Sequence, residues 1–162
     1  MENLKLTRVD FRLIHGQVIT RWVGRLSVTD ITVIDDRTKK SPILLRVLLG
    51  AAPKGVNVTC YTLEEATERW VNGEVPTGNL MILFRDCETA KKAWEAGIKF
   101  PSLQIGGTEG AGNKKNVYRN VVLSQEDFDA MKPLMEAGVR VYCQPIPEDA
   151  EYPLEDAAGK FK

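Results

Sequence analysis

The sequence predicts an α/β protein with an open, mostly parallel twisted sheet of about six to seven strands and helices on both faces. Two observations support this fold class. Short runs rich in β-branched residues alternate with longer segments whose apolar residues recur at helical spacing, which is typical of βαβ units. One run, residues 80–84, contains no polar residue, as expected of a strand buried on both faces of a sheet.

The predicted strands are the β-rich runs bounded by turn residues and helix caps. They are residues 4–9, 31–35, 56–61, 80–84, 102–105, 117–123 and 139–144. The all-apolar run 80–84 is predicted to occupy the centre of the sheet, and residues 117–123 are predicted to form one irregular strand.

Capping residues and apolar periodicity mark the helices. The first helical pattern extends from Val18 to Leu26, where apolar positions recur about every four residues. Ser41 and Pro42 supply an N-cap and a proline at the first helical position for a helix that continues to Leu49.

Three more helices each end at a glycine: Gly73, Gly97 and Gly138. The first of them begins at Thr62, which together with Glu65 has the pattern of a capping box. The chain has the length of one domain, so residues 1–162 are predicted to form a single domain. Its proline-bearing, acidic tail, residues 145–162, is predicted to wrap the surface.

Composition excludes several classes of function. Lys+Arg and Asp+Glu each total 22, so the formal net charge is zero, whereas a protein that binds duplex nucleic acid carries a basic excess. The chain has one histidine, His15, which excludes any mechanism that needs two. Cys60, Cys87 and Cys143 are odd in number and widely spaced, which argues against disulfides and a structural zinc site and predicts buried apolar residues.

The ends and the hydropathy of the chain bear on its location. The N-terminus lacks the basic and apolar regions of a signal peptide, and no run approaches the ~18 apolar residues of a membrane span. These features predict a cytoplasmic protein.

His15 lies in the loop between the first predicted strand and the first helix, where open α/β sheets place their ligand sites. An imidazole nitrogen titrates near neutral pH and can act as a nucleophile. Gly16 gives an anion close access to the backbone, and the amides of Gly16 and Gln17 open the helix. The residues at and beside this loop predict an anion or phosphate site at His15.

Charged residues surround this histidine in the sequence. Arg8 and Arg12 are predicted to bind a phosphate group. Asp10 is predicted to belong to the same phosphate-binding site, where it accepts a hydrogen bond from the ring or orients an arginine. The alternatives are that the two arginines are ordinary solvated charges and that His15 is an ordinary loop residue.

Two other segments are weaker candidates. Asp35 and Asp36, together with Asp10, could hold Mg²⁺ as in a receiver domain, but the third predicted strand ends without an aspartate, so they are interpreted as cap or wall residues. The glycine-rich stretch 106–112 matches neither a dinucleotide-binding nor a P-loop motif and is predicted to be a flexible or tightly turning loop that borders the site.

The loop resembles the active-site loop of the enzyme IIB subunits of the mannose/fructose/sorbose family of the bacterial sugar phosphotransferase system. That family has Asp-Asp-Arg-Leu-Ile-His-Gly-Gln-Val, and residues 12–18 of this chain match it without interruption. Further agreements extend along most of the chain: Trp22, Ala51-Ala52-Pro53, the apolar strand before Arg85, and Ile105-Gly106-Gly107. The chain departs from the family at Phe11, where an acidic residue is usual, and in the basic turn 37–40; both bear on partner and sugar identity.

The resemblance implies an α/β phosphoryl carrier that needs no metal and no other cofactor. His15 would accept a phosphoryl group from a phosphohistidine of a IIA domain or subunit and donate it to a sugar imported by the membrane IIC and IID subunits. Family members accept the group on Nδ1, and the sequence does not distinguish the two nitrogens. The sugar could be mannose, fructose, sorbose or an amino sugar, and the protein would associate peripherally with the membrane permease, with a homo-oligomer possible.

Two rival functions share features with this sequence. Histidine phosphatases also form a phosphohistidine after an N-terminal strand, but they have an arginine where this chain has Ile14, and they use a second histidine. A non-catalytic regulatory or anion-binding IIB-like module is not excluded by the sequence.

Overall fold

The computed structural model describes residues 1–110 and 112–162. Seven strands form one sheet in the order β3-β2-β4-β1-β5-β8-β9. Six of them are parallel: β1 (Leu4–Asp10), β2 (Asp30–Ile34), β3 (Asn57–Tyr61), β4 (Leu80–Phe84), β5 (Ser102–Gly107) and β8 (Arg140–Cys143). The short edge strand β9 (Tyr152–Pro153) runs antiparallel to β8. The predicted α/β class with a mostly parallel sheet is therefore confirmed.

The middle of the sheet is β1, with β4 beside it, so the prediction that residues 80–84 form the central strand was wrong by one position. The predicted burial of this strand is confirmed, because every residue of β4 is buried. Alternate β4 side chains enter two separate cores: Leu80, Ile82 and Phe84 pack into one, and Met81 and Leu83 into the other.

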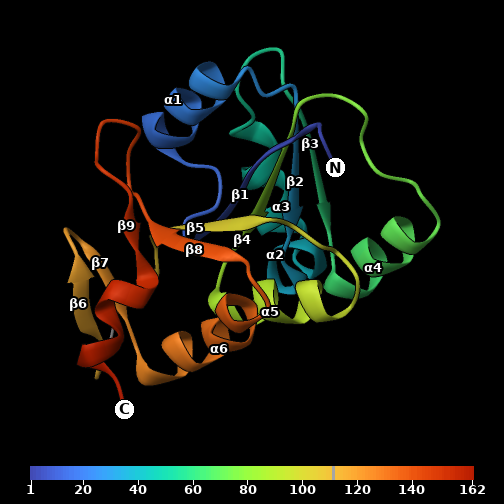
Figure 1. Ribbon diagram of the computed structural model, residues 1–162. Helices are drawn as coiled ribbons and strands as arrows, with labels where there is room; N and C mark the ends of the chain where they lie inside the picture. Colours follow the sequence, from blue (N-terminus) through green and yellow to red (C-terminus); the bar gives the residue numbers. More distant parts are fainter. Residues whose placement is uncertain (111) are drawn as a thin grey trace.

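Helices cover both faces of the sheet, with α1 on one side and α5 and α6 on the other (Figure 1). Their bounds are α1 (Gly16–Leu26), α2 (Asp36–Lys40), α3 (Pro42–Gly50), α4 (Leu63–Val71), α5 (Cys87–Glu95), α6 (Gln125–Glu136) and the 3₁₀ helix η1 (Leu154–Lys160). The predicted caps form: Ser41 accepts a hydrogen bond from the amide of Leu44, and Thr62 and Glu65 make the capping box.

The segment 117–123 is not one strand. It contributes to a separate antiparallel hairpin of β6 (Lys115–Tyr118) and β7 (Val121–Leu123). The reason is Arg119, whose φ of 51° in the left-handed region turns the chain back between the two strands.

The tail, residues 145–162, pairs β9 with β8 and then forms η1. Leu154 and Ala157 of η1 are buried in the core beside α6, and the ring of Phe161 stacks on Phe128 with centroids 4.4 Å apart. These contacts attach the tail to the body of the protein rather than leave it loosely on the surface.

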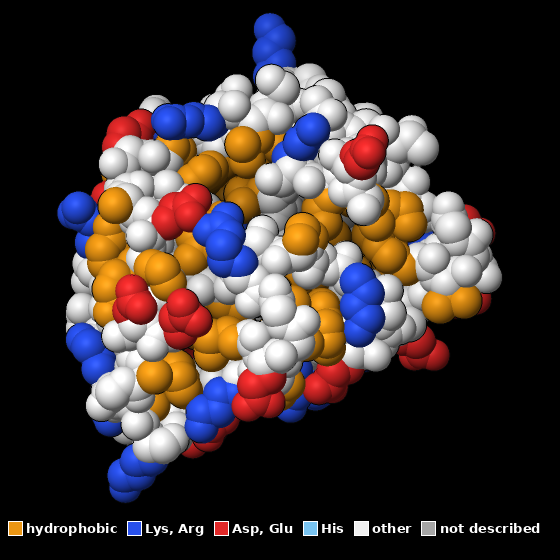
Figure 2. Space-filling model, viewed as in Figure 1, with side chains coloured by type: hydrophobic (Ala, Val, Ile, Leu, Met, Phe, Trp, Pro, Cys, Tyr) orange, Lys and Arg blue, Asp and Glu red, His pale blue; other side chains and the backbone are white. Residues whose placement is uncertain are grey.

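The three cysteines are buried and unbridged, as predicted. Burial raises the pKa of Cys60 to about 11 and that of Cys143 to about 12. Within residues 1–110 and 112–162, every helix falls short of the length and apolarity of a membrane span. Acidic and basic side chains are interspersed over the face seen in Figure 2, in keeping with the balanced composition.

Candidate active site

The carboxyl ends of β1, β2, β4 and β5 meet at one edge of the sheet, and the His15 loop lies there. The loop leaves β1 after Asp10 and enters α1 at Gly16. His15 is the N-cap residue of α1, half-buried and in extended conformation. Gly16 and Gln17 are exposed at the start of the helix, where backbone amides lack acceptors within the helix.

Two residues of the His15 loop have a backbone conformation in the left-handed region. Gly16 has φ of 50°, and the space around an added Cβ is open, so the glycine is needed for its conformation and not for room. Leu13 has φ of 55°, which is uncommon for a residue with a side chain. Its amide donates to the carbonyl of Asp10 at 2.9 Å, and its side chain is buried in the core beside α1. Packing therefore holds this turn in a strained form.

The imidazole of His15 has one buried nitrogen. Its Nδ1 is shielded from solvent and has no hydrogen-bond partner among the described residues. An unsatisfied buried nitrogen is unusual, and a catalytic role is one of the explanations for such a group. For Nδ1 to accept a phosphoryl group, the His15 side chain or the atoms that cover it must move.

Arg12 is the predicted site arginine that reaches solvent, with 34% of its side chain exposed. Its backbone amide and its Nε both donate to Oδ1 of Asp10, at 3.1 and 3.2 Å, and its Nη2 lies 3.5 Å from Oδ2. The guanidinium also lies over the ring of Phe11, 5.1 Å from its centroid. Arg12 is thus a positive charge held at the protein surface by a buried carboxylate.

Arg8 was predicted to bind phosphate, but its side chain is completely buried, which argues against direct contact with a phosphate at the surface. Its Nη2 donates to Asp10 Oδ2 at 3.1 Å and to the carbonyl of Pro145 at 2.9 Å, and its Nη1 donates to the carbonyl of Gln144 at 3.0 Å and to the side chain of Gln104. Desolvation lowers the pKa of Arg8, and the charge of Asp10 opposes that shift. Arg8 therefore supports Asp10 from beneath.

Asp10 is also completely buried, and both of its oxygens accept from arginines. A carboxylate in that position repels a phosphate rather than binding it. These contacts fit one of the two roles expected of Asp10, the orientation of an arginine, and they argue against its predicted place among the phosphate-binding residues.

Gly106 and Gly107, the first two glycines of the stretch 106–112, belong to β5 and are not part of a loop. A Cβ on Gly106 would stand 2.0 Å from Nη2 and 2.1 Å from Cζ of Arg8, so this glycine makes room for the buried guanidinium. The carbonyl of Gly107 accepts from the amide of Phe11 at 3.2 Å, which ties β5 to the His15 loop. Residue 111 of the stretch lies outside the described residues.

Asp35 is the N-cap residue of α2, which agrees with its interpretation as a cap residue. Its Oδ2 accepts from the amide of Thr38 at 3.1 Å and from the hydroxyl of Thr38 at 2.6 Å. The same oxygen accepts from Nε of Arg85 at 3.0 Å. Asp36 instead accepts from the amide of Leu63 at 2.8 Å, so the two neighbouring aspartates face different elements.

Arg85 is a site residue that the sequence reasoning did not assign. Besides Asp35, its guanidinium donates to the hydroxyl of Thr38 and to the carbonyl of Phe11, each at 3.0 Å. It thereby joins the end of β4, helix α2 and the His15 loop. The available signal was its position, since Arg85 directly follows the buried strand β4 at the carboxyl edge of the sheet.

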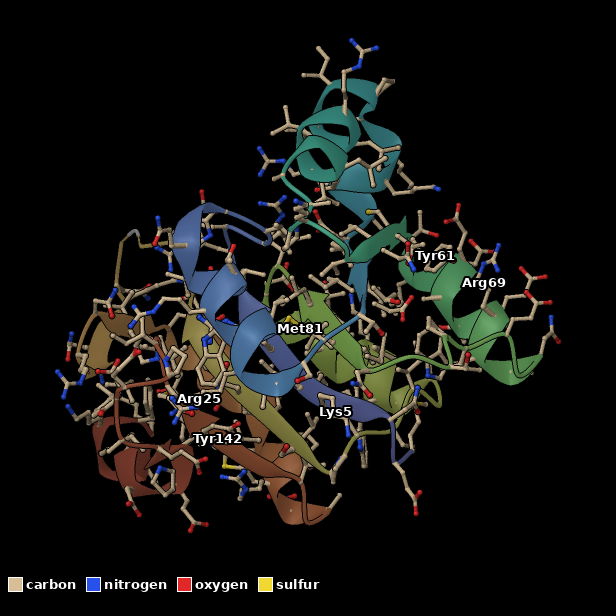
Figure 3. All side chains as sticks on the ribbon, turned by 90° about the horizontal axis from the view of Figure 1, so that it is seen from above. Lys5, Arg25, Tyr61, Arg69, Met81 and Tyr142 are labelled. Carbon is tan, nitrogen blue, oxygen red and sulfur yellow. The ribbon has the colours of Figure 1, made fainter. Side chains whose placement is uncertain are left out.

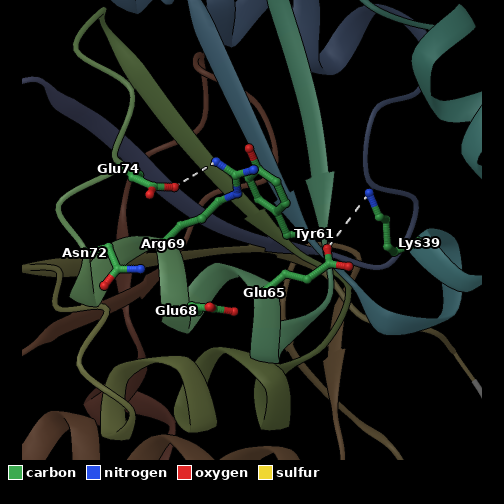
Figure 4. Close-up of a pocket in the computed structure, with 7 residues that line it drawn as sticks. All are labelled: Lys39, Tyr61, Glu65, Glu68, Arg69, Asn72 and Glu74. Carbon is green, nitrogen blue, oxygen red and sulfur yellow. Dashed lines mark hydrogen bonds and ion pairs between the residues drawn. The ribbon is translucent and has the colours of Figure 1, made fainter.

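A cavity of about 400 Å³ lies along β3 and α4, and no residue of the His15 loop belongs to its lining (Figure 4). Four of the five charged residues that line it form ion pairs: Arg69 pairs with Glu74 at 3.2 Å and Lys39 with Glu65 at 3.9 Å. Arg69 also lies over the ring of Tyr61, 4.7 Å from its centroid. Because these charges are paired within the cavity, the His15 loop is the better candidate for chemistry.

Comparisons with known proteins bear on the family and the fold of the chain. A sequence model of the family described as "PTS system sorbose subfamily IIB component" matches residues 4–162. The crystal structure of the IIBSor domain of the sorbose permease from Klebsiella pneumoniae superimposes with a TM-score of 0.89 at 27% identity, covering 97% of this chain and 96% of that one.

Two curated relatives have different lengths. The fructose-specific EIIB component of Bacillus subtilis is 25% identical over 150 residues, 93% of this chain and 92% of the relative. The mannose-specific EIIAB component of Escherichia coli is 28% identical over 156 residues, 96% of this chain but 48% of the relative. The chain thus spans about half the length of the mannose-specific protein.

Proposed function

The chain belongs to the sorbose-subfamily IIB components of the sugar phosphotransferase system, and from that premise we propose that His15 carries a phosphoryl group between a IIA donor and an imported sugar. The observation that supports this most is the setting of the chain's one histidine. It lies at the carboxyl end of the central strand, at the start of α1 and close in sequence to the anchored Arg12.

Two transfers make up the proposed cycle. In the first, a neutral nitrogen of His15 attacks the phosphorus of a phosphohistidine on the donor, the donor's N–P bond breaks, and its imidazole leaves. In the second, a sugar hydroxyl attacks the phosphorus on His15, the new O–P bond forms as the N–P bond breaks, and the hydroxyl proton is released. Because the transition state is loose, positioning and fixed charge contribute most of the catalysis.

The protein's own groups have distinct parts in these steps. Arg12 supplies positive charge to the equatorial phosphoryl oxygens, and Asp10 keeps its guanidinium in place. The amides of Gly16 and Gln17, at the positive end of α1, add hydrogen-bond donors. Arg8 acts only through Asp10, and no step passes through a metal or another cofactor.

The proposed partners are a IIA domain or subunit as donor and the membrane IIC and IID subunits, which present the sugar. The chain would act as a single IIB-type domain, cytoplasmic and peripherally associated with the permease. Its relatives are named for fructose, mannose, N-acetylgalactosamine and sorbose at similar identities, so the sugar class includes hexoses and amino sugars.

Intact-mass analysis tests the proposal. The chain is incubated with phosphoenolpyruvate, enzyme I, the phosphocarrier protein and its IIA protein. We expect one acid-labile phosphoryl group per chain, and none on the His15→Gln variant. A wild-type chain that gains no phosphate, or a His15→Gln chain that still gains one, would contradict it.

A further inference from the structure

Helix α3 exposes a group of large apolar side chains. Ile43 and Val47 are 76% and 65% exposed, and we call these two residues the α3 patch. Leu49 is 44% exposed but follows Val47 by two residues and so faces another side of the helix. Ile43 and Val47 are four residues apart and therefore lie on one side of this nine-residue helix. Figure 3 shows α2 and α3, drawn in teal, projecting from the rest of the molecule. A projecting helix with this much exposed apolar surface is typical of a protein interaction site.

The α3 patch is continuous with the proposed site of phosphoryl transfer. A cavity of about 120 Å³ lies between α3 and the His15 loop. The loop lines it with Arg12, Leu13 and Ile14, and α3 lines it with Leu44, Val47 and Leu48. Val47 thus belongs to the α3 patch and, together with Arg12, to the lining of this cavity. A protein that covers α3 also covers the rim of the site.

The surroundings of the patch are basic. Residues 36–50 contain four basic residues and one acidic residue, although the whole chain has no net charge. Arg37, Lys40 and Arg46 are exposed next to or on α3. Lys40 lies 3.9 Å from Asp36, the acidic residue of the segment. A partner protein that complements this surface would be apolar at the centre of its contact area and acidic at the rim. A phosphorylated histidine on that partner would add further negative charge.

We propose that the α3 patch is the docking surface for the phosphoryl donor, a IIA protein with an apolar, acid-rimmed surface beside its phosphohistidine. The proposal rests on the proposed function, because direct transfer between two histidines requires the donor to cover the rim of the His15 site. The mannose-specific EIIAB relative, whose name includes an A component and whose length is about twice the matched part, supports an A component as the neighbour of this domain.

Other occupants fit less well. A lipid surface or a second copy of the chain seated on α3 would cover the wall shared by Val47 and Arg12 and so obstruct the donor. A lipid surface is also flat, whereas the cavity beside Val47 can receive a side chain of a partner protein. The basic, apolar composition by itself would suit an anionic membrane, so vesicle binding is included in the test.

The test compares two equally exposed apolar residues. Ile43 and Val71 are each 76% exposed, but α4 starts at the carboxyl end of β3 and runs back, so Val71 at its end lies away from the His15 edge. Calorimetric titration of the full chain with its unphosphorylated IIA protein should give a Kd at least tenfold weaker for Ile43→Asp than for the wild type. Val71→Asp should bind within twofold of the wild type.

Separate measurements distinguish the possible failures. Equal Kd values for Ile43→Asp and Val71→Asp, or no binding of IIA by the wild type, would overturn the docking proposal even if His15 is phosphorylated. Weakened binding by Ile43→Asp supports docking even if His15 gains no phosphate, which would overturn only the proposed function. Loss of self-association, of binding to phosphatidylglycerol vesicles or of binding to the IIC and IID proteins in Ile43→Asp, with IIA affinity unchanged, would assign the patch to that occupant and overturn the proposal.

Discussion

Replacing Gly106 by alanine should disturb both the stability of the protein and phosphoryl transfer. The added Cβ would stand 2.0 Å from Nη2, 2.1 Å from Cζ and 2.6 Å from Nε of Arg8. A long side chain can normally move away, but Arg8 is completely buried and its guanidinium donates to Asp10, Gln104 and two backbone carbonyls. The guanidinium must therefore shift and weaken several hydrogen bonds of a buried charge.

The expected loss follows from those contacts. Each hydrogen bond to a charged group contributes about 1.5–3 kcal/mol, so weakening one or two of them should lower the free energy of unfolding by about 3 kcal/mol. Because Asp10 also holds Arg12, the single-turnover rate of phosphoryl transfer should fall about tenfold at saturating phospho-IIA. The affinity for IIA should stay unchanged, because Gly106 is buried beneath the site.

Urea unfolding and rapid-quench transfer measure the two effects, and Gly24→Ala is the matched control. Gly24 is an exposed glycine within α1, and no atom lies within 4 Å of an added Cβ there. That variant should be more stable than the wild type by about 0.5–1 kcal/mol, with an unchanged transfer rate. If Gly106→Ala unfolds within about 0.5 kcal/mol of the wild type, the assigned role of the Arg8 network is wrong.

Two substitutions and one labelling experiment test separate parts of the account. Asp10→Asn removes the charge that holds two arginines, so it should lower the free energy of unfolding by about 3–5 kcal/mol and slow transfer; unchanged urea unfolding would contradict this. Arg12→Ala removes a side chain that is 34% exposed, so transfer should slow at least tenfold while urea unfolding shifts by under about 1 kcal/mol; an unchanged single-turnover rate would count against Arg12. Burial raises the pKa of Cys60 to about 11 and of Cys143 to about 12 from an ordinary 9.0, so both thiols stay protonated and resist iodoacetamide at pH 8. Their contribution to stability is complete below pH 9.0 and should be lost as the pH rises toward 11 and 12; rapid labelling of the native protein at pH 8 would refute this burial.

Much of the fold follows from local sequence signals. The six parallel strands and the caps at Ser41 and Thr62 are predictable because β-rich runs and capping residues act over a few neighbouring positions. Strand β9 has two residues and exists only because β8 offers an edge for pairing. The short helix α2 begins at the residue after Asp35, whose contact with Arg85 depends on elements 50 residues apart. Such long-range contacts leave no periodic pattern in the sequence.

The site shows the same division. His15, Gly16 and Arg12 are recognisable because they share one loop, whereas the burial of Arg8 depends on β1 being the middle strand. A signal for that burial was present: Leu6, Arg8 and Asp10 alternate along β1, so they share one face of the strand. In a strand covered on both faces, a charged residue at such a position must pair with a neighbour of opposite charge.

Return of the phosphoryl group to its donor tests the central claim most directly. The chain is phosphorylated through its IIA protein, purified, mixed with an excess of unphosphorylated IIA protein, and both masses are followed with time. A phosphoryl carrier on His15 should lose its phosphate while the IIA protein gains the same amount. A chain that never accepts phosphate on His15, or that keeps it in the presence of the IIA protein, would be an anion-binding or regulatory module and would contradict the account.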